Sequence, residues 1–155
     1  MSYNSVEFSK YVIGRLDEFK KKDVKYEYDV TKINKLLYIL YGFYWPNRHL
    51  RLLDEQPKLW PYGPVFPKVY KNIKQNGFES DYRCSVDEND MELFDKILRN
   101  FGTFKASVLS NWSHERNSPW DQARMREINK YGESRWSETL NDVDIQIYFS
   151  HLSYE

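Results

Sequence analysis

The sequence predicts a mainly α-helical, single compact domain over residues 1–155, with about six helices and at most a small β-ribbon. Three observations lead to this fold class. Apolar residues recur with a helical period of about 3.6 residues along most of the chain. Polar caps and glycine stops bound these periodic segments. Five of the six prolines fall within residues 46–67, which leaves the rest of the chain free to form helices. A chain of 155 residues can bury enough surface to fold as one domain without a metal or a disulfide.

Two amphipathic segments open the chain. The first predicted helix is capped by Ser5 and runs to about Lys22, and its apolar face repeats at helical spacing: Phe8, Val12, Leu16 and Phe19. The second is capped by Thr31 and carries a broad apolar stripe, so we expect it to be central. Pro46 and Asn47 should end this helix, because proline disfavours the helical conformation of the residue before it.

The proline-rich segment 46–67 is predicted to be an ordered loop packed on the core, because it also holds many apolar residues. We expect a short strand near 57–60 and a sharp turn at Gly63–Pro64. If Gly63 has a positive φ, alanine at this position should cost about 1 kcal/mol or more.

A third helix is predicted from residue 65 or 66 to about residue 76. Pro67 lies in its first turn, where no amide donor is needed, and Gly77 follows its end. Residues 78–86 have the composition of a short strand, which would pair with the stretch before this helix.

Four more helices are predicted after residue 84. Ser85 begins a capping-box pattern for the fourth, whose apolar face is Met91, Phe94, Leu98 and Phe101. Thr103 is the expected cap of the fifth, whose apolar residues are Phe104, Val108, Leu109 and Trp112. The clearest start is at 118–121, Ser-Pro-Trp-Asp, for a sixth helix that runs to about Tyr131. A last short helix spans roughly 142–151, and its expected inward residues are Val143, Ile147 and Phe149.

Composition argues against several classes of protein. Lys+Arg and Asp+Glu each total 23, so the net charge is zero, which argues against nucleic acid as the partner. No apolar run approaches the roughly 18 residues of a membrane span, and the start of the chain lacks the pattern of a signal peptide. Cys84 is the one cysteine, which rules out an internal disulfide framework. We expect a cytoplasmic protein without a membrane partner.

Reactive motifs are weak in this sequence. No pair of glycines has the spacing of a phosphate-binding loop, and the four residues that favour zinc lack the spacing of a metal site: His49, His114, His151 and Cys84. We therefore expect no enzymatic activity, no cofactor and no metal. Two rival interpretations stay open. One is an enzyme with a Cys84–His114 nucleophile pair. The other is a phage or mobile-element DNA-associated regulatory protein that uses a basic helix face, formed by Lys68, Lys71 and Lys74.

Large aromatic residues gather in two segments, 59–70 and 109–120, where each segment joins a rigid turn to a helix start. Core packing with capped helix entries is one explanation, and a rigid aromatic platform for a protein partner is the other.

These segments resemble the Panacea domain, the SocA-like antitoxin family. A Thr-x-x-x-Lys-Leu-Leu-Tyr pattern stands at 31–38, and a Trp-x-Tyr-Gly-Pro-Val-x-Pro-x-Val-Tyr run follows at 60–70. The third motif is Leu-Ser-x-x-Ser-His-x-x-x-Ser-Pro-Trp at 109–120, and Tyr148–Phe149 matches a closing Tyr-Phe pair. The resemblance covers about residues 4–150, and three motifs in the right order are far more specific than one.

The resemblance implies a cytosolic, bacterial or phage-borne antitoxin of a toxin–antitoxin or phage-defence system, which neutralises a cognate toxin by direct binding. It implies no enzymatic activity, and we expect no added DNA-binding domain. The identity of the toxin and the oligomeric state stay open. Exposed aromatic and arginine side chains are the natural anchors of such an interface. We predict partner-binding residues in the 45–66 loop, namely Trp45, His49, Arg51, Trp60 and Tyr62, and at the 111–120 corner, namely Trp112, His114, Arg116 and Trp120.

Overall fold

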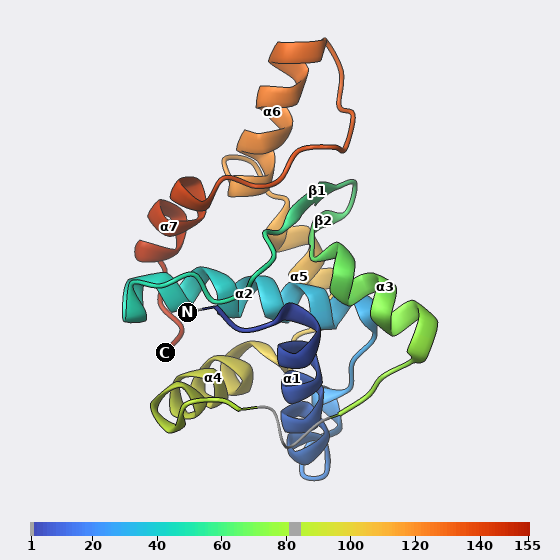
Figure 1. Ribbon diagram of the computed structural model, residues 1–155, viewed down its shortest axis with the longest axis vertical. Helices are drawn as coiled ribbons and strands as arrows, with labels where there is room; N and C mark the ends of the chain where they lie inside the picture. The colour runs from blue at the N-terminus through green and yellow to red at the C-terminus, as the bar shows by residue number, and fades with distance from the viewer. Residues whose placement is uncertain (1, 81–84) are drawn as a thin grey trace.

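The computed structural model describes residues 2–80 and 85–155, and the predicted fold class is confirmed. Within these residues lie seven α-helices, one short 3₁₀ helix and one two-stranded sheet (Figure 1). The elements in chain order are α1 (Ser5–Lys20), η1 (Val24–Tyr26), α2 (Val30–Arg48), β1 (Lys58–Trp60), β2 (Gly63–Val65), α3 (Pro67–Asn76), α4 (Glu88–Phe101), α5 (Ala106–Ser113), α6 (Pro119–Tyr131) and α7 (Asp142–Ser150).

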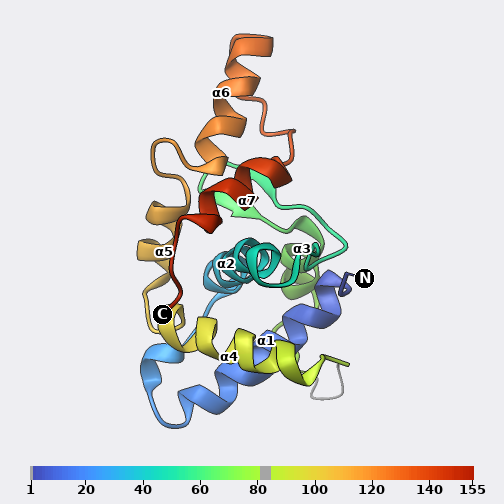
Figure 2. The ribbon, with the colours of Figure 1, turned by 90° about the vertical axis from the view of Figure 1, so that its left-hand side faces the viewer.

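Helix α2 is the centre of the molecule, as its wide apolar stripe predicts. Every residue from 32 to 44 is buried, and α2 contacts α1, α3, α4, α5 and α7. Figure 2 looks along α2 and shows the other helices arranged around it. A helix buried on all sides needs apolar residues around most of its surface, and the three buried polar residues of α2 are hydrogen-bonded to backbone groups: Lys32, Asn34 and Lys35.

Aromatic rings join α1 and α4 to this centre. Phe8 and Phe94 are fully buried, and their ring centroids lie 5.0 Å apart in an edge-to-face arrangement. At the end of α2, the carboxylate of Asp90 accepts hydrogen bonds from the Tyr44 hydroxyl at 2.7 Å and from Arg48 Nε at 2.7 Å. Helix α4 is therefore fixed to α2 by apolar packing and by a shielded ionic contact.

The short strand predicted near 57–60 is confirmed as β1, which pairs with β2 in an antiparallel hairpin. A third segment joins the outer edge of β1, because Leu59 N donates to Glu138 O and Leu140 N to Pro57 O, both at 2.9 Å. The strand predicted over 78–86 is wrong for the described part: residues 78–80 and 85–86 are not in a strand, and 81–84, including Cys84, lie outside the described residues. The segment that joins the hairpin is instead residues 138–140, which pair with β1.

Four predicted caps are wrong by one or two positions. The observed N-caps are Asn4, Asp29, Asp87 and Lys105, where Ser5, Thr31, Ser85 and Thr103 were expected. In the first three cases an Asn or Asp side chain accepts a hydrogen bond from a backbone N–H of the first turn. Asn and Asp are at least as favourable at this position as the serine or threonine nearby.

The predicted end of α2 at Pro46 is also wrong, since the helix continues to Arg48. Proline removes one backbone donor, and the Asn47 side chain adds a different hydrogen bond to the same turn, because its Nδ2 donates to the Phe43 carbonyl at 2.8 Å. The helix ends where His49 adopts a left-handed conformation with φ 58° and donates its N–H to Trp45 O.

Three predicted helix faces need correction. Val143 and Ile147 of α7 are 58% and 57% exposed, whereas Ile145 and Phe149 are buried. Phe149 packs directly over Gly42 of α2, where any side chain would collide with its ring, and this contact fixes which face of α7 turns inward. Exposed apolar residues also occur on or near α4 and α5, namely Met91, Phe104 and Val108.

Helix α6 projects from this helical body, and residues 132–141 run back beside it (Figures 1 and 2). Its predicted start and end are confirmed: Ser118 Oγ caps the helix, Pro119 is its first residue, and Gly132 follows with φ 79°. We call residues 119–141 the arm, and α1–α5 with α7 the body.

Candidate protein-binding site

The three sequence motifs meet at one junction between α2, the hairpin and α5. Lys35 of α2 is 2% exposed, and its Nζ donates to the carbonyl of Pro64 at 3.0 Å. Gly63 has φ 115°, and a Cβ at this position would collide with Ser113 Oγ and lie 3.1 Å from Lys35 Cε and Nζ. The predicted positive φ is confirmed, and glycine is required here both by conformation and by space.

Burial lowers the pKa of Lys35 to about 8. The ammonium faces a backbone carbonyl, and it adjoins the turn that the second motif forms. Asn34, the preceding residue, accepts a hydrogen bond from Phe66 N at 2.9 Å through its Oδ1. Adjacent side chains of α2 therefore hold the middle of β2 and the residue that follows the strand, which gives the first motif a structural role.

Two hydrogen bonds attach the hairpin to the third motif. Trp120 Nε1 donates to the Trp60 carbonyl at 2.7 Å, and Ser110 Oγ donates to the Tyr62 carbonyl at 2.7 Å. The ring of His114 lies 5.3 Å from that of Trp120. These backbone and ring contacts orient the hairpin and leave the Tyr62 side chain 78% exposed.

The structure divides the nine predicted partner-binding residues into two sets and two separate residues. One set lies at this junction: Trp60, Tyr62, His114 and Trp120. Trp120 is 7% exposed, and Trp60 and His114 are partly buried beside Tyr62. Trp112 stands apart, because it packs on Tyr38 and Phe149 between α2 and α7. Arg116 is exposed in the turn between α5 and α6.

The remaining set lies where α2 meets α7. The rings of Trp45 and His49 are 6.2 Å apart. Arg51 donates from Nε and Nη2 to Asp142 Oδ2 at 3.0 and 2.6 Å, while Tyr41 donates its hydroxyl to Asp142 Oδ1 at 2.6 Å. Arg51 thus connects the proline-rich loop to the first turn of α7.

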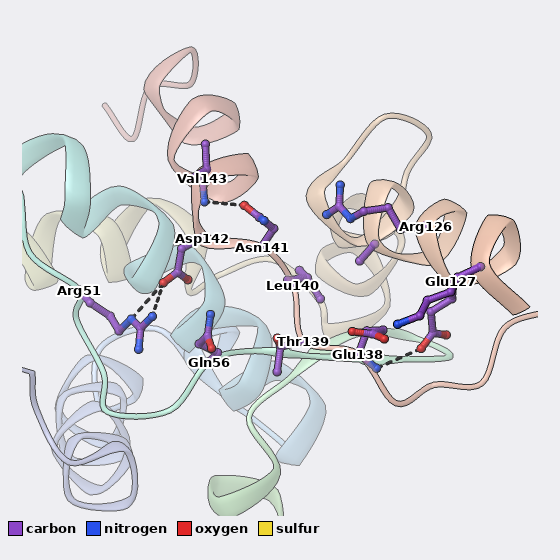
Figure 3. Close-up of a pocket in the computed structure, with 12 residues that line it drawn as sticks. Arg51, Gln56, Arg126, Glu127, Glu138, Thr139, Leu140, Asn141, Asp142 and Val143 are labelled. Carbon is purple, nitrogen blue, oxygen red and sulfur yellow. Dashed lines mark hydrogen bonds and ion pairs between the residues drawn. The ribbon is translucent and has the colours of Figure 1, made fainter.

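A cleft of about 570 Å³ separates the arm from the body (Figure 3). Arg51, Gln56 and Asp142 line its body side, and Arg126 and Glu127 line its arm side. Arg126 also forms an ion pair with Asp144 of α7. Four of the charged side chains that line the cleft are therefore already paired, namely Arg51, Arg126, Glu127 and Asp142, and the shape of the cleft depends on how the arm is held.

Glu127 holds the arm together, and the sequence reasoning missed it. This side chain is 0% exposed, and its carboxylate accepts from the backbone N–H groups of four successive residues, 135–138, at 2.9–3.0 Å. Ser137 Oγ adds a fifth hydrogen bond at 3.0 Å. Burial alone would raise the pKa of Glu127, but these donors outweigh burial and lower the pKa to about 2.

A signal for Glu127 does exist in the sequence. It follows the buried residues Trp120 and Ala123 at helical spacing, so it is an acidic residue on the inner face of α6. A buried carboxylate needs several donors, and here the returning backbone provides them. Trp136, in the middle of that segment, has a left-handed φ of 58° and donates its backbone N–H to Glu127 Oε1 at 2.9 Å.

The comparisons with known proteins agree with the three motifs. The profile of a family described as "Antitoxin SocA-like, Panacea domain" matches residues 33–121, which include the whole junction. The chain belongs to this family. The SocA-like chain is also similar to a protein named Antitoxin SocA from Caulobacter vibrioides (strain NA1000 / CB15N), with 27% identity over 105 residues. That alignment covers 57% of this chain and 56% of the relative, so it spans about half the length of each. No solved structure matches the chain.

Two further findings concern other kinds of site. Over residues 2–80 and 85–155, no group of three or more His, Cys, Asp or Glu side chains has the geometry to hold a metal ion. No helix in these ranges is both long and apolar enough to cross a bilayer.

Proposed function

We propose that this SocA-like chain neutralises a cognate toxin by direct binding in the cytoplasm, as a folded surface and without catalysis. Membership of the antitoxin family supports the antitoxin role. The observation that supports the binding mechanism is that buried and exposed residues of the junction have different roles. Buried motif side chains such as Lys35 and Trp120 hold the hairpin in place, while Tyr62 stands 78% exposed at its tip.

The rigid hairpin favours binding over the other mechanisms. A side chain presented on a fixed backbone loses little conformational entropy when it is covered, so it contributes more to affinity. Tyrosine is well suited to this position, because it combines a large apolar ring with a polar tip. Exposed His49, Arg51 and Arg116 extend the candidate surface to the end of α2 and to the α5–α6 turn. Trp112 and Trp120 then serve as scaffold residues.

The test is co-expression of the chain with the open reading frame adjacent to its gene. We expect the neighbouring product to arrest growth alone, and the pair to restore growth and to copurify as a complex. Tyr62→Ala should weaken the complex and leave the thermal midpoint near that of wild type. Trp120→Ala, in which a buried ring and its hydrogen bond are lost, should reduce both stability and rescue.

Two outcomes would contradict this proposal. A harmless neighbour would remove the toxin–antitoxin assignment, and rescue of growth without a complex would indicate catalytic reversal or degradation of the toxin. In the second case, alkylation of Cys84 at neutral pH tests the enzyme interpretation, since an activated thiolate reacts much faster than an ordinary thiol.

A further inference from the structure

Helix α3 carries a basic face that the fold does not use. Lys68, Lys71 and Lys74 are all exposed, whereas Val69 and Ile73 are buried against the body. The helical period places Lys71 directly opposite the buried pair. Within the part of the chain that the structure describes, none of the three lysines forms an ion pair, and α3 itself contains no acidic residue.

The carboxylate at the start of α3 does not neutralise this face. Glu55 is buried, and its Oε2 accepts a hydrogen bond from the backbone N of Lys68 at 2.9 Å. It caps the helix and points at the backbone, so the lysine ammonium groups remain a separate positive surface. The chain as a whole has zero net charge, so this face is a local concentration of charge and not part of a generally basic protein.

Two aromatic rings continue the basic face toward the hairpin. The Lys74 ammonium lies 5.5 Å from the centroid of the Tyr70 ring, and the Tyr70 ring lies 5.0 Å from the Trp60 ring in an edge-to-face arrangement. Figure 1 shows α3 leading directly away from β2. The lysines therefore adjoin the same hairpin that presents Tyr62.

We propose that the α3 face formed by Lys68, Lys71, Lys74 and Tyr70 receives an acidic surface of the partner toxin. This inference rests on the proposed function and names the chemistry of the partner. Three cations that form no ion pair with any residue the structure describes, over about 9 Å of helix, complement a cluster of carboxylates. Charge complementarity of this kind speeds association and fixes the orientation of a complex. Half-buried tyrosine and tryptophan beside them are typical of protein interfaces.

A protein fits these observations better than a nucleic acid does. The Trp60 and Tyr70 rings meet edge to face, so they do not form the parallel stacking platform that single-stranded nucleic acids use. The charged residues are lysines only, and no arginine on α3 offers the bidentate geometry that reads bases or grips phosphates.

The experiment compares two charge-reversed triple variants of the full chain. The test variant carries Lys68→Glu, Lys71→Glu and Lys74→Glu. The control carries Lys22→Glu, Lys96→Glu and Lys105→Glu, which makes the same change in net charge at three exposed lysines elsewhere. Association with the purified product of the adjacent reading frame is followed by surface plasmon resonance from about 50 to 500 mM salt, and thermal midpoints check that both variants fold.

We expect the test variant to bind at least about 100-fold more weakly than wild type at low salt, because like charges would then face each other. The control variant should stay within about threefold of wild type. The association rate of wild type should fall steeply with salt, and that of the test variant should not. Reversal of acidic residues on the partner should restore binding to the test variant.

Three results would overturn the proposal, and they are distinguishable. If wild type does not bind the neighbouring product, the proposed function itself fails, and this inference fails with it. If wild type binds and the test variant binds equally well, the antitoxin role stands and the α3 face is not its interface. If the test variant binds the toxin normally but loses a salt-dependent affinity for duplex DNA that wild type has, α3 is a nucleic-acid surface.

Discussion

The body and the arm of this molecule are stabilised by different kinds of interaction. In the body, thirteen consecutive residues of α2 are buried, and aromatic rings fill the spaces between α1, α2 and α4. In the arm, one carboxylate binds four successive backbone N–H groups, and a hydrogen bond from Trp120 to Trp60 links its base to the hairpin. The body is therefore stabilised mainly by many apolar contacts, whereas the arm relies on a few specific polar contacts beside its buried residues Trp120, Ala123 and Leu140.

Because of this difference, substitutions in the body and in the arm should have different effects on stability. Apolar contacts add up over area, so a single loss in the body weakens the whole cooperative unit. The Glu127 carboxylate, the polar hub of the arm, has a large local effect on stability, since its removal leaves several backbone donors without an acceptor. Substitutions in the body should lower global stability, and substitutions at the hub should release the arm alone.

The largest expected effect is in the body, at Phe94. Its ring is fully buried and lies within 5.0–6.2 Å of four other aromatic rings. Phe94→Ala should lower the free energy of unfolding by about 4 kcal/mol, through lost burial and the cavity that remains. Urea unfolding measures this, with Met91→Ala, which alters an exposed residue of the same helix, as the control. A loss below about 1 kcal/mol would show that the body can repack around the cavity.

The next effect is in the arm, at Glu127. Glu127→Gln should lower the free energy of arm opening by roughly 3 kcal/mol at neutral pH, because an amide cannot accept all the hydrogen bonds of the carboxylate. Native-state hydrogen exchange should show faster exchange of the amides of residues 135–138 and little change in α2. Glu133→Gln, an exposed residue of the arm, is the control. Equal acceleration in α2 would mean that arm and body unfold as one unit.

Acid should distinguish the two regions as well. The pKa of Glu127 is lowered to about 2 from its ordinary value of 4.5. As the pH falls, the carboxylate is therefore protonated in the unfolded state before it is protonated in the folded state. The stabilisation is complete above about pH 4.5 and is lost as the pH falls toward 2. Exchange of the arm amides in wild type should accelerate over this window relative to Glu127→Gln. A parallel pH dependence in both proteins would contradict the assigned role of the carboxylate.

The same difference explains what could be predicted from the sequence. Periodicity identified the central position of α2 and the inward face of α1, because burial repeats with the helix. For α7 it was right for Phe149, which is buried, and wrong for Val143 and Ile147, which are exposed, since a close approach of Phe149 to Gly42 decides that helix's orientation. The contact between Leu59 and Glu138 joins residues about eighty positions apart, and no local pattern encodes such a pairing.

The motif junction combines the apolar packing of the body with specific hydrogen bonds like those of the arm. A substitution at Gly63 tests how closely the junction is packed. Gly63→Ala should cost roughly 2–3 kcal/mol, because alanine would both strain a positive φ and collide with Ser113 Oγ. Gly132→Ala is the matched control: Gly132 has φ 79° in the left-handed region, and nothing lies within 4 Å of its added Cβ, so only the conformational strain of roughly 1 kcal/mol remains. Equal losses in the two variants would mean that the junction yields easily to a methyl group.

The smallest expected effect on stability is at Arg51, where the body faces the cleft. Its side chain is 44% exposed although it pairs with Asp142, and exposed ion pairs contribute little to stability. Asp142 also keeps the hydrogen bond from Tyr41 when Arg51 is removed. Arg51→Ala should therefore change the free energy of unfolding by less than about 1 kcal/mol and still weaken toxin neutralisation in the co-expression assay. Parallel losses of stability and rescue would instead make Arg51 part of the scaffold. Arg51 would then be needed for stability, as Phe94 is, and the candidate partner surface would be limited to Tyr62 and α3.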